Sequence, residues 1–171
     1  MSNPFNLVHN KLWDMIERVP DVDDIVAKAN RIKYNSTVSR DIEKQRIQAA
    51  DVPELSLVTE GGPVRMQNTS STTMITRRWT WVIATGDKRL NEFLFPVEWM
   101  LIGALLNWKS ELTALEWDSQ RFVHRCDVLD TLEGMTAQDR NRNMVGWSSL
   151  WRCEVEMHFK TSDIITTLNA P

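Results

Sequence analysis

A strict alternation of side-chain types runs through residues 147–161, WSSLWRCEVEMHFKT, and it limits the possible fold severely. Successive side chains of a β-strand point to opposite faces, so an alternation of this length predicts a strand with one buried face. Cys153 then lies on the buried face, whereas Glu154, Glu156 and His158 lie on the other. A thiol and an imidazole on opposite faces of one strand cannot form a catalytic pair. The stretch therefore predicts scaffold rather than a reactive site.

Similar patterns elsewhere define the expected architecture. Strands are predicted near residues 53–58, 72–85, 121–129 and 147–161. Residues 88–115 change to a helical period and predict one central helix across the sheet, in which Pro96 must begin a new turn or produce a kink. The order of these segments predicts an α+β fold, a mostly antiparallel four-stranded sheet packed by N-terminal helices and the central helix.

The N-terminal helices are expected within residues 4–30. Asn3 is a suitable N-cap, and Pro4 fits the first helical position, where its missing N–H costs nothing. An apolar stripe then follows at helical spacing: Phe5, Val8, Leu12, Met15, Ile16 and Val19. A second helix is predicted after Asp21 or Asp23 and through DIVAKANRI, because carboxylates suit a helix N-terminus.

Two polar segments are expected to be surface loops. Residues 59–72 form either a long exposed loop or the arms of an extended hairpin, and residues 131–146 form a loop between the last two strands. Long loops in a compact domain are usually functional or disordered. The candidates for a contact with another copy of the chain or with a different partner protein are Arg65, Met66, Gln67, Arg140, Arg142 and Met144. Residues 34–51 fit either a helix or an ordered loop.

Size and composition predict one globular domain over residues 1–171, made and kept in a cytoplasm. The net charge of −3 gives no general attraction to nucleic acid or to anionic membranes. The longest apolar run, FLFPVEWMLIGALLNW, contains Pro96, Glu98 and Asn107 and is short for a membrane span. We therefore expect neither a membrane nor a sequence-specific nucleic acid as a partner.

No pattern of catalytic, cofactor-binding or metal-binding residues emerges. The histidines at 9, 124 and 158 fall on three different predicted elements. His9 is expected at the surface or boundary of its helix, and His124 shares the parity of Cys126, which predicts a core histidine. The two cysteines are expected to be small buried hydrophobes. We predict no enzyme, no cofactor and no metal site.

Eight tryptophans, by contrast, are many for a core of this size. Tryptophan is enriched in protein–protein interfaces, where its rigid surface is desolvated at low entropy cost. We expect most of the eight in the core and two or three in contact with another chain.

The order of elements, with the phrases DVPELSLV, RRWTWVIATGD and LWRCEVEMHFKT, resembles the tail terminator (tail completion) proteins of long-tailed bacteriophages. The resemblance covers roughly residues 5–161. It implies a structural virion protein, assembled in the host cytoplasm, that caps the tail tube as a ring and helps form the head–tail junction. The implied partners are further copies of the chain in a ring, expected to be a hexamer, the tail tube protein, and neck or head-completion proteins.

Two other hypotheses stay open. The chain is alternatively a monomeric small-molecule-binding or catalytic α+β domain that uses His124, Cys126 and Cys153. It is otherwise another part of a phage tail, such as a tube or neck subunit. Thiol reactivity distinguishes the catalytic hypothesis, because buried structural thiols are inert.

Overall fold

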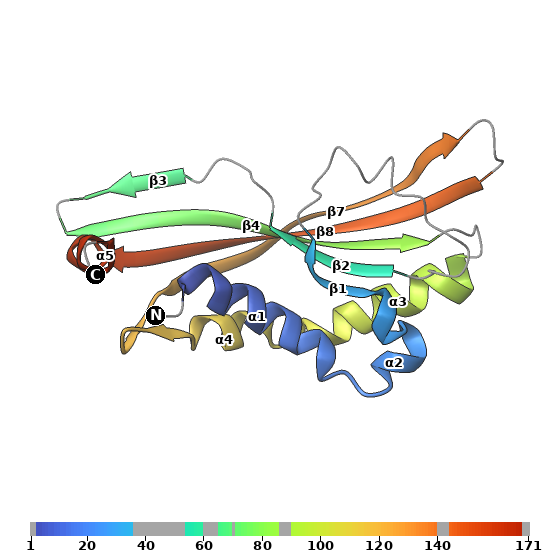
Figure 1. Cartoon of the computed structure of the whole chain (residues 1–171), viewed down its shortest axis with the longest axis horizontal. Helices are drawn as coiled ribbons and strands as arrows, with labels where there is room; N and C mark the ends of the chain where they lie inside the picture. The colour runs from blue at the N-terminus through green and yellow to red at the C-terminus, as the bar shows by residue number, and fades with distance from the viewer. Residues whose placement is uncertain are drawn as a thin grey trace.

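The computed structural model describes residues 3–35, 54–59, 65–69, 71–85, 90–139 and 144–168. Within them the chain forms a long twisted sheet with helices along one face (Figure 1). The helices are α1 (Pro4–Glu17), α2 (Val22–Ile25), the 3₁₀ turn η1 (Lys28–Asn30), α3 (Leu90–Ala104), α4 (Trp108–Thr113) and α5 (Thr161–Leu168). The strands are β1 (Arg31–Asn35), β2 (Glu54–Thr59), β3 (Arg65–Asn68), β4 (Thr72–Thr85), β5 (Glu116–Trp117), β6 (Gln120–Arg121), β7 (Val123–Asp139) and β8 (Met144–Lys160). The expected α+β class is confirmed.

The main sheet has the order β1-β2-β4-β8-β7, with β3 also paired to β4. Within the described ranges the β1–β2 pairing is parallel and the other pairings of this sheet are antiparallel. The mostly antiparallel arrangement is thus confirmed, but the sheet has six strands where four were expected. The additional strands β1 and β3 come from segments expected to be helix and loop.

The predicted faces of β8 are confirmed where its side chains are described, whereas on β4 residues of both parities are buried from Trp79 to Ile83. On β8, Cys153, Val155, Met157 and Phe159 are buried, whereas Glu154, Glu156 and His158 are partly exposed. On β4, Trp79 and Trp81 are fully buried. They belong to one hydrophobic cluster that also includes side chains of α1, α3 and α4. The sheet and the helices therefore share one core.

Helix α1 begins as predicted. The Asn3 side chain accepts a hydrogen bond from the backbone N–H of Phe5 (2.9 Å), and Pro4 is the first helical residue. Ion pairs connect α1 to α4. Glu111 accepts hydrogen bonds from Lys11 (2.9 Å) and Arg18 (2.6 Å).

Two helix predictions are wrong in extent. The helix predicted through DIVAKANRI ends at Ile25, because Val26 takes an extended conformation and is fully buried; the chain then enters β1, which pairs with β2. The predicted central helix over 88–115 is two helices, α3 and α4. Between them the N–H of Leu105 bonds to the carbonyl of Ile102 as well as that of Leu101, so the last turn tightens before Trp108.

Both predicted loops contain strand in the residues that the structure describes. Within 59–72, β3 pairs antiparallel with β4, so the hairpin alternative is the correct one. Residues 131–139 and 144–146 are the ends of β7 and β8, which pair with each other as far as Asp139 and Met144. Each of these two strands spans 17 residues, roughly 55 Å at 3.3 Å per residue. Their hairpin extends beyond the helices at the right of Figure 1.

Strand β7 also contains a β-bulge near its start. Val123 pairs with Met157 and Arg125 pairs with Glu156, so two steps along β7 match one step along β8. His124 is the extra residue, and it is exposed while Cys126 is buried. The prediction that His124 shares the buried face of Cys126 is therefore wrong, because the bulge shifts the alternation by one residue.

Candidate functional site

The six residues predicted to contact a neighbour lie at two ends of the sheet. Arg65, Met66 and Gln67 belong to β3, and Gln67 is exposed. Met144 begins β8 at the distal end of the long hairpin, and Arg140 and Arg142 lie outside the described residues. In Figure 1 β3 and the hairpin end are on opposite sides of the molecule. The structure therefore does not bring these two groups together.

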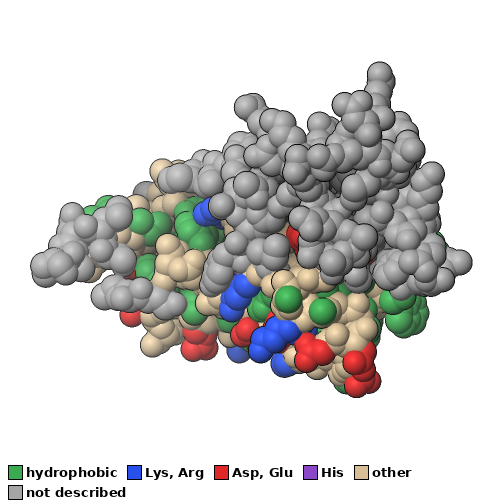
Figure 2. Space-filling model, turned by 45° about the vertical axis from the view of Figure 1, so that its right-hand side comes forward, with side chains coloured by type: hydrophobic (Ala, Val, Ile, Leu, Met, Phe, Trp, Pro, Cys, Tyr) green, Lys and Arg blue, Asp and Glu red, His purple; other side chains and the backbone are tan. Residues whose placement is uncertain are grey.

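A different surface stands out on α3 and in the turn that follows it. Four large apolar side chains at positions i, i+4, i+7 and i+11 point to solvent: Phe95 (46% exposed), Trp99 (76%), Ile102 (39%) and Leu106 (77%). We call these four residues the outer stripe of α3. This spacing places side chains on one face of a helix. In Figure 2 hydrophobic side chains gather at the lower right of the molecule, the side on which α3 lies in Figure 1.

The other face of α3 packs on the sheet. Val97 and Leu101 are fully buried, and Met100 and Leu105 are nearly so. At 100° per residue the buried and the exposed positions lie on opposite sides of the helix axis. Helix α3 is thus apolar on two faces, and the fold of the described chain covers one of them. Contiguous exposed apolar surface of this kind marks interaction sites in soluble proteins.

A smaller apolar surface lies at the other end of the molecule, on α5. Ile164 packs against the core, whereas Ile165 is 53% exposed. Helix α5 directly follows β8 and is held to the start of β4, since the N–H of Thr161 bonds to the carbonyl of Ser71 and the Thr73 and Thr161 hydroxyls lie 3.1 Å apart. Figure 1 places α5 at the left end of the sheet, far from the first turns of α3 at the right.

The two thiols are buried in the core, as predicted. Both cysteines are free, and burial raises the pKa of Cys126 to about 11 and that of Cys153 to about 12. A thiol with such a pKa carries almost no thiolate at neutral pH, and thiolate is the reactive form. The bulge also turns His124 away from Cys126, so the structure does not assemble the Cys/His pair that the catalytic hypothesis requires.

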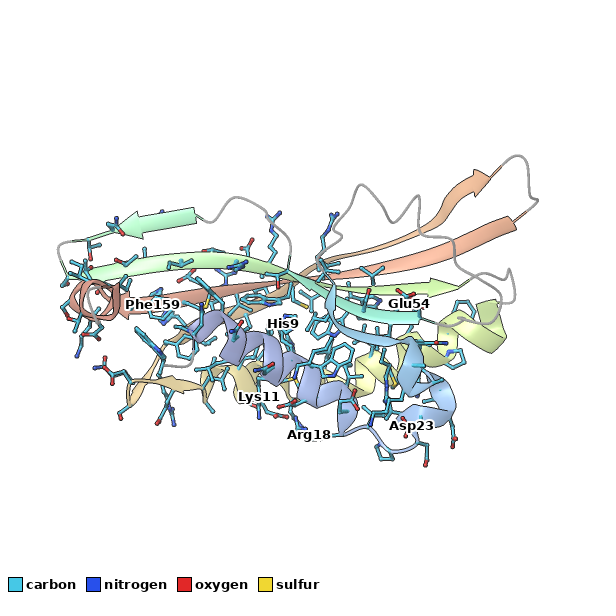
Figure 3. The ribbon with its side chains drawn as sticks, viewed as in Figure 1. His9, Lys11, Arg18, Asp23, Glu54 and Phe159 are labelled. Atoms are coloured by element: carbon cyan, nitrogen blue, oxygen red, sulfur yellow. The ribbon has the colours of Figure 1, made fainter. Side chains whose placement is uncertain are left out.

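His9 is not at the surface, so the prediction for it is wrong. It is 4% exposed and lies between α1 and the sheet (Figure 3). Its Nε2 is 2.6 Å from the backbone carbonyl of Lys33, so Nε2–H donates there, and its Nδ1 faces the Thr59 hydroxyl at 3.5 Å. Burial lowers the pKa of His9, and this favours the neutral ring. His9 is a structural link between α1 and the strands β1 and β2.

Most of the tryptophans are in the core, as predicted. Of the seven whose side chains are described, Trp13, Trp79, Trp81 and Trp108 are buried, and Trp117 and Trp151 pack against the same cluster. Trp99 is the exception in the described part of the chain. It lies in the middle of the outer stripe, where an interface tryptophan would be expected.

Comparison with protein-family models gives no match, and a search of curated proteins finds no significant similarity. None of the helices in the described ranges combines the length and apolarity that crossing a membrane requires.

Proposed function

We propose that the chain is a structural virion protein that caps a phage tail tube as a ring and helps to form the head–tail junction. The observation that carries the proposal is the outer stripe of α3. Trp99 and Leu106 are mostly exposed. A contact that buried them completely would contribute a free energy of about 1.5–3 kcal/mol for each side chain. A subunit that works in an assembly recovers this free energy when the contact forms.

The occupant of the outer stripe is a second copy of the same chain. A ring requires a heterologous contact, in which one flank of a subunit binds a different flank of the next. The chain has two such flanks, because the outer stripe and the exposed Ile165 of α5 lie on well-separated elements. The stripe alone is smaller than a standard interface of about 800 Å² per partner, so neighbouring strands must add to it.

The long β7–β8 hairpin supports the same function. Its two strands are about three times the usual length of five to six residues. A hairpin that extends beyond its own helical layer has a strand edge with which a neighbouring subunit or the tail tube can pair. We assign the contact with the tube, or with neck and head-completion proteins, to β3 and to the distal end of the hairpin, residues 131–139 and 144–150, which excludes Val128.

The catalytic alternative loses its specific support. It required a reactive thiol near His124, and both thiols are buried with raised pKa values while His124 points away from them. The third hypothesis, a tube or neck subunit, shares the self-association of the first and differs in where the protein binds.

The test is electron microscopy of the purified, untagged protein alone and mixed with purified tail tubes. We expect rings, or density at tube ends, for the wild-type chain. The variant Trp99→Glu should form neither, because a carboxylate in a buried apolar contact is strongly disfavoured. Density along the tubes rather than at their ends would favour a tube subunit.

A matched control is Val128→Glu on β7. Val128 is also an exposed apolar residue (41%), but it lies outside the outer stripe. The control should assemble like the wild type, and both variants should keep the wild-type circular dichroism spectrum. Equal loss of assembly in both variants, or full assembly in both, would remove the outer stripe from the proposal. An absence of rings and of end density for the wild type would remove the function itself.

A further inference from the structure

Three potential metal ligands meet on the sheet face opposite the helices. One nitrogen of His124, one oxygen of Glu156 and one nitrogen of His158 all lie within 4.8 Å of one another. The His124 and His158 rings are stacked, with centroids 4.3 Å apart and planes 16° apart. The Glu156 carboxylate is 2.7 Å from Nε2 of His158. We call these three residues the His–Glu cluster.

The β-bulge creates this cluster. In a regular strand His124 would share the buried face with Phe122 and Cys126, and the bulge turns it to the other face instead. The backbone N–H of His158 bonds to the carbonyl of Phe122 (2.8 Å), which fixes β8 beside the bulge. Bulges often re-aim a side chain at a functional site. The backbone is thus arranged to bring His124 to His158.

The charges around the cluster leave Glu156 available to a cation. Among the described residues, Arg78 binds Glu154 (3.1 Å) and Arg125 binds Asp127. In the sheet register Arg125 is opposite Glu156 and Arg78 is opposite Glu154. Arg77, opposite Val155, lies over the Phe5 ring instead, 4.7 Å from its centroid. Glu156 lies within hydrogen-bond distance of His158 Nε2 (2.7 Å), and a metal ion bound by both groups would replace this contact.

We propose that the His–Glu cluster is a binding site for a divalent transition-metal ion of the Zn²⁺ type. Two imidazoles and one carboxylate are a ligand set that zinc uses when it keeps a fourth position open. Bonds of 2.0–2.1 Å in a tetrahedron place the ligand atoms roughly 3.4 Å apart. Rotations of partly exposed side chains, with His158 and Glu156 separating slightly and His124 approaching, reach this geometry.

The metal joins the bulge of β7 to β8 and leaves its fourth position on the exposed sheet face. Water fills that position in an isolated chain. The site does not depend on the proposed ring function, because its ligands lie on β7 and β8 and not on the outer stripe of α3. Its role is to stabilise the pairing of the two strands that form the long hairpin.

The experiment is a Zn²⁺ titration of untagged, chelator-treated protein in competition with a chromophoric chelator. We expect one Zn²⁺ per chain and a higher melting temperature when it is bound. His124→Ala, His158→Ala and Glu156→Gln should each weaken binding by more than the roughly 10–100-fold seen for second-shell groups. His124 is exposed, so its replacement should leave the fold intact.

The matched control is Glu154→Gln, which removes a carboxylate two residues away on the same strand and the same face. This variant should bind Zn²⁺ like the wild type. Co²⁺ should give visible d–d bands without the near-ultraviolet thiolate band, because no cysteine takes part. The proposal is overturned if the wild type does not bind, if the cluster variants bind as well as Glu154→Gln, or if a thiolate band appears; a simple His158–Glu156 ion pair is then the explanation.

Discussion

The two faces of α3 have nearly the same chemistry and opposite surroundings. Leu101 is fully buried against the core, and Leu106, little more than one turn later, is 77% exposed. The inner face contributes to folding by leaving water. The outer face contributes less of this kind to the isolated chain, because Trp99 and Leu106 keep about three quarters of their surface exposed. A helix that is apolar all round is usually buried on all sides, and the proposed function supplies the second covering layer from another copy of the chain.

The largest expected effect is on the inner face. Leu101→Ala should lower the free energy of unfolding by about 2–5 kcal/mol, because it leaves a cavity in a closely packed core. Leu106→Ala should change it by less than about 0.5 kcal/mol, as expected for an exposed side chain. Urea unfolding of dilute protein measures both. Similar losses in the two variants would mean that the outer face is also packed within the single chain.

A smaller effect concerns the buried histidine on the inner side of α1. The pKa of His9 is lowered from 6.5 in the folded chain, so the unfolded chain binds a proton more readily than the folded chain. Stability is then complete above about pH 6.5 and is lost as pH falls from there towards the lowered pKa, by at most about 1.4 kcal/mol per pH unit.

Urea unfolding at pH 7.5 and pH 5.5 measures this loss, and His9→Gln should lose less stability over the same interval than the wild type. His9→Gln is expected to be less stable at both values, because the link to the Lys33 carbonyl and Thr59 is weakened. The same pH dependence in wild type and variant would show that His9 is not the group responsible.

The smallest effect is expected beside the outer stripe. A Cβ added at Gly103 would meet no atom within 4 Å, and glycine inside a helix costs about 0.5–1 kcal/mol relative to alanine. Gly103→Ala should therefore stabilise the dilute chain by about that amount in thermal or urea unfolding. If a second copy packs closely on α3, the same change should weaken assembly. A gain in both stability and assembly would place the contact away from Gly103.

Local patterns predicted much of the scaffold. The alternation in β8 predicted the correct faces, and Asn3 with Pro4 predicted the start of α1. These features depend on neighbouring residues alone. The length of the β7–β8 hairpin could not be predicted in the same way, because residues 131–139 and 144–146 show no alternation and are extended by pairing across the hairpin.

The candidate sites required tertiary information. The spacing of Phe95, Trp99, Ile102 and Leu106 was visible in the sequence, but a helix with two apolar faces does not reveal which face meets the sheet. His124 was placed on the wrong face because no glycine or proline marks the bulge between Val123 and Arg125. His9 was placed at the surface because the backbone carbonyl that it binds lies 24 residues away, at Lys33.

The most direct test of the central claim is the accessibility of a thiol placed on the outer stripe. Ile102→Cys keeps Trp99, and both native thiols are buried with raised pKa values, so the new thiol should dominate labelling by a maleimide. We predict fast labelling in dilute solution and strong protection in rings or on tail tubes, with Val128→Cys reactive in both states. Equally fast labelling at position 102 in the free and the assembled protein would contradict the account.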